Sequence, residues 1–565
     1  MASCTHRIPA RTVKATVGRA VSRHNSLLRS GRAALSIGAL VLTGAGAFAA
    51  DLYVDGTLGN DAMPCTAPGI TACRTIQAAI NKATSGDNIH VAAGVYPEPA
   101  LGPLTVNKRL ILLGSGAGVD ARTRVGGESI VSDPQGTSVS ASGVVVDGFT
   151  FQGSSVPSSG FGIWLNPGIG GTVIRNNIIQ NNITGIGLAN VGIQAVISRN
   201  LIRLNNVPGA RSGAGIYTDQ LVGGSVVENI LITANAFTGN HEVGIDISNT
   251  DSSGGLFNMT VSNNSFVSDG RAMALFNTDN VLFENNSVPN AALPSAAIQI
   301  FDHNNNLMIL GNDLKSGLGH AIRLSFVGLV GGPSSGVVIN ENNIGTVGAA
   351  SFVLDGLLVD PGSHIGTVNA ECNWWGSPTG PSNPNNPGGA GEEVVGDADF
   401  TPWLTAPTPV GACIGGVSTP GKVTGGGQIA GEDPVFSPLG DLISLPATMR
   451  SRAGPNSKAT FGLAIKCCPA SGNLDYNDHD AGVRIKAQSI NNLFITSGSC
   501  GPNTHATFSG TAQVIRSTGT TTEPFTVEVD DCGEPGTADT FGIRTTTYSN
   551  GPSPLLGGNI QIRGQ

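Results

Sequence analysis

Acidic residues recur between positions 219 and 302 of the chain, and Tyr, Gln, His and Arg side chains lie among them or just beyond. Carboxylates that stand a few ångströms apart share a proton, bind a cation or act as an acid and a base. The candidate catalytic residues are Asp246, Asp279, Asp302 and Arg323. The candidate substrate-binding residues are Tyr217, Gln299, His303 and His320. No cofactor is certain, and the candidate ligands for Ca²⁺ are Asp219, Asp251 and Asp279.

Two reactions would use these residue types. A lyase needs carboxylates that hold Ca²⁺ against the acid group of its substrate, and a strong base such as Arg323. A glycosidase needs two carboxylates about 5 to 9.5 Å apart, for which Asp279 and Asp302 are the candidate pair. Ordinary turn aspartates on a solvated surface are the alternative, because Asp is common in turns. The pattern alone does not show an enzyme.

The elements that must position these residues follow from a repeat between about 140 and 355. In each copy, two apolar residues are followed by an Asn and then by another apolar residue. Successive copies lie between 20 and 50 residues apart, and a repeat with this period predicts a solenoid. Asn tolerates left-handed backbone angles in turns and forms hydrogen-bonded stacks, so we interpret it as scaffold. The repeated residues are Asn177, Asn200, Asn235, Asn264, Asn286, Asn312 and Asn342.

Each copy also contains a second short segment rich in Ile, Val and Leu, which predicts a strand. A left-handed solenoid would repeat a hexapeptide motif. This sequence has no such repeat, which favours a right-handed solenoid. If successive coils stack at about 4.8 Å, Asp251 and Asp279 occupy the same position in neighbouring coils and lie about 5 Å apart. The predicted outward column of the second segments is Gly187, Tyr217, Asp246, Ala274, Gln299, Arg323 and Val353.

Both ends of the solenoid carry segments suited to cover its core. Residues 73–83 place Ile76, Ala79 and Ile80 on one face of a predicted helix. At the other end, we interpret Trp374 and Trp375 as a closing cap, because an open sheet end must be covered. Stacking of these two rings on a sugar is the alternative.

The sequence DLYVDGTLGNDAMPC, followed by RTIQAAINKATSGDNIHVAAGVYPE, resembles the start of bacterial secreted proteins of the pectate-lyase-like right-handed β-helix superfamily. This resemblance implies an all-β fold built on a right-handed parallel β-helix. It says little about activity, because the same architecture carries lyases, glycosidases, epimerases and non-catalytic adhesins.

Beyond residue 420 the coil repeat stops, and short alternating segments predict a small antiparallel β-sandwich. The segments GKVTGGGQI and DDCGEPGTADTFGI resemble the post-COAP module of secreted bacterial proteins. The predicted organisation is a signal peptide (1–49), an N-terminal cap with the first coils (50–139), the β-helix with its closing cap (140–410), a linker (411–420) and the C-terminal module (421–565).

The first 50 residues combine seven Lys/Arg with an apolar run that ends in Ala47-Phe48-Ala49, which is typical of a secretory signal peptide. An uncleaved membrane anchor is the alternative. The eight later cysteines fit an exported, oxidised protein. Their grouping suggests Cys65 with Cys73, Cys372 with Cys413, and Cys467 and Cys468 with Cys500 and Cys532.

Without the first 50 residues the chain has 23 basic and 39 acidic residues, a net charge of −16, which excludes binding to nucleic acid or anionic membrane through charge. We expect a secreted or cell-surface monomer with no membrane span after signal cleavage. The expected partner is extracellular polysaccharide or cell-surface glycan, which we expect the protein to bind; whether it also cleaves the polymer, as a lyase or glycosidase, is left open by the sequence. The alternative is a non-catalytic, adhesin-like structural protein.

Overall fold

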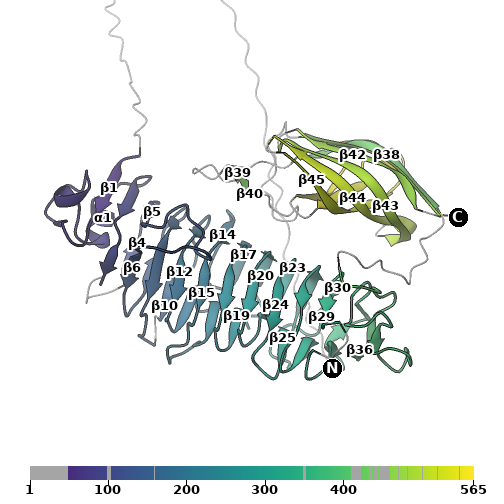
Figure 1. Cartoon of the computed structure of the whole chain (residues 1–565), viewed down its shortest axis with the longest axis horizontal. Helices are drawn as coiled ribbons and strands as arrows, with labels where there is room; N and C mark the ends of the chain where they lie inside the picture. The colour runs from purple at the N-terminus through teal and green to yellow at the C-terminus, as the bar shows by residue number, and fades with distance from the viewer. Residues whose placement is uncertain are drawn as a thin grey trace, which may run out of the picture. The chain divides into compact units, whose positions relative to one another are not determined.

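The computed structural model describes two regions, a β-helix and a C-terminal module (Figure 1). The predicted signal peptide and linker lie outside the described residues. Among the described residues, no helix has the length and apolar character needed to cross a membrane. The described ranges are 49–97, 103–157, 160–347, 351–408, 421–431, 435–436, 442–443, 458–468, 470–479, 481–498, 500–517, 519–545 and 548–564.

Three parallel sheets, named A, B and C here, wind into the β-helix, with β1 and α1 at one end and β36 near the other (Figure 1). Sheet A contains, in spatial order, β1 (Asp51–Val54), β2 (Asn88–Val91), β5 (Ile111–Leu113), β8 (Val145–Asp147), β11 (Val173–Arg175), β14 (Ala195–Ser198), β17 (Val226–Thr233), β20 (Gly255–Ser262), β23 (Thr278–Glu284), β26 (Asn304–Leu310), β30 (Val338–Asn340), β34 (Val368–Asn369) and β37 (Ala398–Asp399), with β29 (Ser334–Ser335) and β33 (His364–Ile365) beside them.

Sheet B contains β3 (Gly94–Tyr96), β6 (Ser129–Ser132), β9 (Phe149–Gln152), β12 (Ile178–Gln180), β15 (Leu201–Arg203), β18 (Ala236–Thr238), β21 (Ser265–Val267), β24 (Ser287–Asn290), β27 (Asp313–Leu314) and β31 (Asn343–Ile344). Sheet C contains β4 (Leu104–Val106), β7 (Thr137–Val139), β10 (Phe161–Leu165), β13 (Thr184–Gly187), β16 (Ala214–Thr218), β19 (Val243–Ser248), β22 (Met273–Phe276), β25 (Ala296–Ile300), β28 (His320–Leu324), β32 (Leu357–Val359), β36 (Gly391–Val395) and β35 (Pro381–Ser382).

Alternate apolar residues of the strands fill the interior of the β-helix, so the predicted repeat is confirmed. Each such side chain contributes about 1.5–3 kcal/mol when fully buried. Because alternate residues of a strand face opposite sides, the residue that follows each inward one points outward. The inward column of sheet C, all fully buried, is Ile163, Ile186, Ile216, Ile245, Met273, Ile298 and Ile322.

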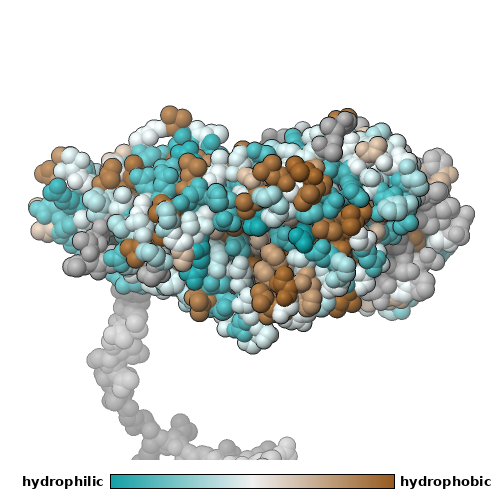
Figure 2. Space-filling view, turned by 90° about the horizontal axis from the view of Figure 1, so that it is seen from below, coloured by the Kyte–Doolittle hydropathy of each residue, from teal (hydrophilic) through white to brown (hydrophobic). Residues whose placement is uncertain are grey.

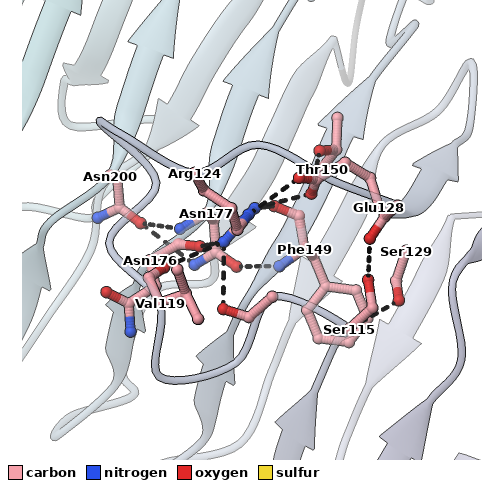
Figure 3. Close-up of polar contacts among 12 residues, drawn as sticks. Ser115, Val119, Arg124, Glu128, Ser129, Phe149, Thr150, Asn176, Asn177 and Asn200 are labelled. Carbon is pink, nitrogen blue, oxygen red and sulfur yellow. Dashed lines mark hydrogen bonds and ion pairs between the residues drawn. The ribbon is translucent and has the colours of Figure 1, made fainter.

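The repeated Asn residues form a continuous buried ladder, as predicted. The main-chain N–H and the side-chain amide of Asn177 both donate to Oδ1 of Asn200, at 2.9 and 3.2 Å (Figure 3). The pattern continues through every predicted Asn and ends one coil later, on Asn373. The left-handed backbone angle belongs to the preceding residue, for example Asn176 with φ 54° and Ala234 with φ 55°. The ladder Asn is therefore selected for its hydrogen bonds and not for its backbone angle.

A second ladder, which the sequence analysis missed, lies five residues after the first in four successive coils. Asn182, Asn205 and Asn240 each donate to the next residue of this ladder, and the last acceptor is Asp269. An Asn or Asp five residues after each of the first four repeated Asn residues is the signal that would have revealed it.

A buried ion pair secures the segment between β5 and β6. Arg124 donates to both carboxylate oxygens of Glu128, at 2.9 and 2.8 Å, and Thr150 donates to the same carboxylate (Figure 3). Arg124 also donates to the main-chain carbonyls of Asn176 and Phe149. The side chains of Arg124 and Glu128 are only 5% and 16% exposed. The pair therefore ties this segment to the next coils.

The predicted covers of the core are present. The helix α1 (Ile76–Lys82) starts at Thr75, whose side chain accepts from the N–H of Ala78, and its apolar face is buried. A short 3₁₀ helix, η1 (Gly69–Thr71), precedes it. Trp374 and Trp375 are 2% and 0% exposed, so they close the core and are not available to stack on a sugar.

Three disulfides are present among the described residues. The Cys65–Cys73 prediction is confirmed. The suggested pairing within the last four cysteines is wrong, because the adjacent Cys467 and Cys468 bond to each other and Cys500 bonds to Cys532. Cys372 is disulfide-bonded, and its expected partner Cys413 lies outside the described residues.

The C-terminal module is antiparallel, as predicted, but its nine main strands form one curled sheet where a sandwich would have two. Curling brings β48 close to β44 and β45 across the interior, so one sheet buries its own apolar face. A small hairpin of β39 (Val435–Phe436) and β40 (Leu442–Ile443) is separate. The sheet order is β47 (Ser549–Pro554), β46 (Thr540–Thr545), β45 (Gly519–Asp530), β44 (Gly501–Arg516), β43 (Val483–Gly498), β42 (Ser471–Asp478), β41 (Lys458–Cys467), β38 (Gly421–Ala430) and β48 (Gly557–Gly564).

Candidate functional site

The outward column of sheet C brings the predicted residues of the second segments into one row. The register confirms six of the seven predicted members. Val353 is wrong, because it lies in the turn before β32, and Leu358 takes its place opposite Arg323. In spatial order the column is Trp164, Gly187, Tyr217, Asp246, Ala274, Gln299, Arg323 and Leu358.

A polar cluster occupies the column at β16 and β19, where Tyr217 and Asp246 are direct neighbours. The Tyr217 hydroxyl donates to Oδ2 of Asp219 at 2.8 Å, and Arg211 lies 3.4 Å from the same oxygen. The Arg211 guanidinium also stands 5.3 Å from the centre of the Tyr217 ring. The other carboxylate oxygen of Asp219 accepts the main-chain N–H groups of Leu221 and Val222. Both carboxylate oxygens of Asp219 therefore accept hydrogen bonds within the protein, and its role is to position the Tyr217 hydroxyl.

Asp246 is the group of this cluster best suited to proton transfer. It is half-buried, and Ser248 donates to its Oδ1 at 2.6 Å. Burial raises the pKa of Asp246 to about 6, with smaller contributions in the same direction from the charges of Asp219 and Glu242, while Ser248 and Arg271 oppose them. A carboxyl with a pKa near the working pH can both give and take a proton. Burial, helped by Asp219, also raises the pKa of Tyr217, which keeps its hydroxyl protonated as a donor.

Aromatic rings flank the polar cluster on the same outer face. Phe161 and Trp164 stack at 6.1 Å on β10, and Phe276 and Phe301 stack at 4.1 Å on adjacent coils. Tyr217 and Phe301 also pack on a small apolar cluster at the surface of sheet C. The view from below, toward the edge of Figure 1 where β10, β19 and β25 are labelled, shows hydrophobic patches between hydrophilic areas (Figure 2). Phe161 is only 4% exposed, whereas Trp164, Phe276 and Phe301 are half-buried, and rings of this second kind can stack on sugar faces.

Farther along the column, the predicted polar residues are engaged with neighbours. Arg323 donates twice to Oδ2 of Asp360, at 3.1 and 2.8 Å. His320 lies 3.0 Å from Asp355, and burial lowers the pKa of His320, with Asp355 opposing the shift. Gln299 is buried and donates to the Ser325 hydroxyl at 3.0 Å. Strands β22 and β25 separate Arg323 from Asp246, so the structure does not bring these two candidates together.

The remaining candidates lie away from the column. Asp302 is fully buried, and its carboxylate accepts the main-chain N–H groups of Val327, Leu329 and Val330. His303 contacts Asn277 at 2.9 Å.

Asp279 belongs to β23 of sheet A and accepts from Asn306 at 3.0 Å. Its neighbour in the preceding coil is Phe257. The prediction that Asp251 and Asp279 occupy the same position in neighbouring coils is therefore wrong, because Asp251 sits in the turn after β19, where coil lengths vary.

The three candidate Ca²⁺ ligands are dispersed over the end of β16, the turn after β19 and sheet A. Within the described ranges, no three His, Cys, Asp or Glu side chains gather closely enough to hold a metal ion.

Arg211, Glu242 and Arg271 are parts of the site that sequence analysis missed. Arg271 donates to the Ser295 hydroxyl at 2.9 Å and lies 3.9 Å from Glu242. All three precede their strands, in turns whose direction the strand alternation does not predict.

Comparison with known proteins agrees with this fold. A family model described as "Right handed beta helix region" matches residues 105–266 and 227–370. The chain therefore contains a right-handed parallel β-helix, and the predicted hand is confirmed. No curated protein sequence matches the chain.

Several solved structures are similar at low identity. Pectate lyase Pel9A is 13% identical, with 64% of this chain and 81% of that chain covered and a TM-score of 0.35. The A-module of the Azotobacter vinelandii mannuronan C-5 epimerase AlgE6 is 13% identical (58% and 94% covered, TM-score 0.30). The enzymatically active domain of bacteriophage CBA120 tailspike protein 2 is 11% identical (92% and 77% covered, TM-score 0.31). These likenesses carry no argument about the activity of this chain.

Proposed function

We propose that this protein is exported, binds an extracellular polysaccharide along the outer face of sheet C, and hydrolyses it at the cluster around Asp246. The observation that carries the proposal is the union, on one continuous face, of the half-buried rings of Trp164, Phe276 and Phe301 with a carboxyl whose pKa is about 6. The disulfides fit an oxidising compartment outside the cytoplasm.

The proposed reaction uses two carboxyl groups. Protonated Asp246 gives its proton to the glycosidic oxygen as the bond from that oxygen to the sugar carbon breaks. Glu242, which is 49% exposed and close enough to influence Asp246, takes a proton from the water that attacks the same carbon. The Tyr217 hydroxyl, oriented by Asp219, lies beside Asp246 and binds a sugar hydroxyl.

Hydrolysis is favoured over lyase chemistry because of the state of Arg323. A lyase would need this guanidinium free to take a ring proton, whereas Asp360 holds it through two hydrogen bonds. No step of the proposed hydrolysis needs Ca²⁺.

The test is a release assay on pectic, alginate-like and neutral polysaccharides, with and without Ca²⁺, that follows both reducing ends and unsaturated ends. We expect reducing ends from at least one polymer, without unsaturated ends and without a need for Ca²⁺. Asp246→Asn should abolish the release, and Asp279→Asn, a matched change on sheet A, should leave it unchanged. Calcium-dependent unsaturated ends would contradict hydrolysis, and binding without any turnover would support the non-catalytic alternative.

A further inference from the structure

Asp269 occupies the last position of the second ladder, where the earlier positions hold Asn182, Asn205 and Asn240. Oδ1 of Asp269 accepts the main-chain N–H of Asn240 at 2.9 Å and its side-chain amide at 2.8 Å. The residue is 1% exposed. Oδ1 of Asp269 therefore accepts the same two hydrogen bonds that the side-chain amide oxygens of Asn205 and Asn240 accept at the earlier positions.

The other oxygen, Oδ2, is buried and has no hydrogen-bond partner among the described residues. At the three earlier positions the amide nitrogen donates to a main-chain carbonyl of the preceding coil, three residues before the residue whose N–H bonds to the same Asn: Ser154 for Asn182, Asn182 for Asn205 and Asn205 for Asn240. Those acceptors are the carbonyls of Phe151, Ile179 and Ile202.

The same register assigns the carbonyl of Phe237 to Oδ2 of Asp269. An ionised Oδ2 would face this carbonyl as a second acceptor, whereas a protonated Oδ2 would donate to it. Leaving such a group unpaired in the interior costs about 1–3 kcal/mol.

Among the described residues, no cation lies where it could compensate a negative charge on Asp269. The strand and turn before Asp269, residues 262–268, and the next coil, residues 287–296, contain no charged side chain. The charged residues on the adjoining segments are His241, Glu242 and Arg271, which lie at the surface and contact one another. Burial accordingly raises the pKa of Asp269 to about 7.

We propose that Asp269 is a carboxylic acid in the folded β-helix, that its O–H donates to the carbonyl of Phe237 as the last link of the second ladder, and that this link makes the stability of the β-helix depend on pH. The ladder stops here because the residue five positions after Asn286 is Ala291, whose side chain has no hydrogen-bonding group. The affected coil is the one that supplies Arg271 to the outer face of sheet C.

The direction of the pH dependence follows from proton linkage. The unfolded chain loses this proton near pH 3.8, whereas the folded chain keeps it up to about pH 7. Between these values the folded state binds more protons, so the free energy of unfolding falls as the pH rises, and it levels off above about pH 7.

The first experiment measures the unfolding temperature of the full chain and of its Asp269→Asn variant from about pH 4 to about pH 9. We expect the two proteins to unfold together at the acid end and the variant to unfold several degrees higher above about pH 7. Asp302→Asn is the matched control, since Asp302 accepts three main-chain N–H groups and its replacement should lower the unfolding temperature at every pH. A constant difference between wild type and Asp269→Asn, of either sign, would overturn the proposal.

A second measurement needs no variant and is local. Amide hydrogen exchange of wild type, corrected for its intrinsic pH dependence, is compared at about pH 5.5 and about pH 8.5. We expect peptides that cover residues 265–276 to lose more protection at the higher pH than peptides near Asn342, in the first ladder. Equal changes in both regions would also overturn the proposal.

Discussion

The interior of the β-helix and the outer face of sheet C contain similar polar residues that have different roles. Inside, Asn264 makes hydrogen bonds both to the coil before it and to the coil after it, and these bonds use its full capacity. Outside, Asp246 has one short bond, to Ser248, and is half-buried. A fully bonded polar group stabilises the fold, whereas a desolvated group with spare capacity is available for a substrate. The two regions should therefore respond differently to mutation.

The largest effect should come from breaking the first ladder. Asn264→Ala removes the buried oxygen that accepts from two donors of Asn235, its main-chain N–H and its side-chain amide. At about 1–3 kcal/mol for each unsatisfied donor, the free energy of unfolding should fall by about 2–6 kcal/mol. Denaturant titration would measure it. A loss below about 1 kcal/mol would show that water or local repacking replaces the ladder.

A second interior test removes Arg124 from its pair with Glu128. Because the partner stays buried with an uncompensated charge, Arg124→Met should cost about 3–5 kcal/mol, and Arg124→Met with Glu128→Leu should recover much of that loss. The double variant is the control for packing. If the stability losses of Arg124→Met and Glu128→Leu, each made alone, added up to the loss of the double variant, the pair would not be acting as a unit.

On the outer face, Asp246→Asn should lower kcat/KM by about 10²–10⁴, the usual contribution of a proton donor. The same change should raise the unfolding temperature above about pH 6, because the folded state no longer carries a desolvated carboxylate there. Gain of stability with loss of activity separates this residue from the ladder residues. A variant that lost both would assign Asp246 to the scaffold.

The pH profile of kcat/KM sharpens the same distinction. If protonated Asp246 is the donor, activity should fall on the alkaline side with an apparent pKa of about 6. Steady-state rates across the pH range would measure it, with buffer controls at constant ionic strength. Activity that rises through this region would identify Asp246 as a base and reverse the proposed roles.

The smallest effect concerns the aromatic rings. Phe301→Ala removes one ring of the stacked pair with Phe276 and should weaken polysaccharide binding by about 0.5–1.5 kcal/mol, or roughly twofold to tenfold. Ile193→Ala, an exposed apolar change in a turn outside sheet C, is the control. Equal loss in both variants would mean that binding does not follow this face.

The repeat made much of this architecture predictable. The seven Asn residues, the helix before the first coils and six members of the outward column follow from periodicity, because a solenoid repeats one environment in every coil. Periodicity failed where coil length varies: Val353 and Asp251 both lie in turns. It also failed for the last cysteines, since spacing cannot choose among pairings.

Short-range alternation and a recurring Asn are enough to specify the solenoid, its covers and the row of residues that faces outward on sheet C, because they are present in every coil. Which of the acidic residues have spare bonding capacity depends on the packing of the folded chain. Asp302, Asp219 and Asp246 have the same side chain and all lie in or just after a strand of sheet C, yet main-chain N–H groups from turns occupy the first two. Desolvation and hydrogen-bond supply depend on what packs around a carboxyl, and those neighbours come from turns that carry no periodic signal.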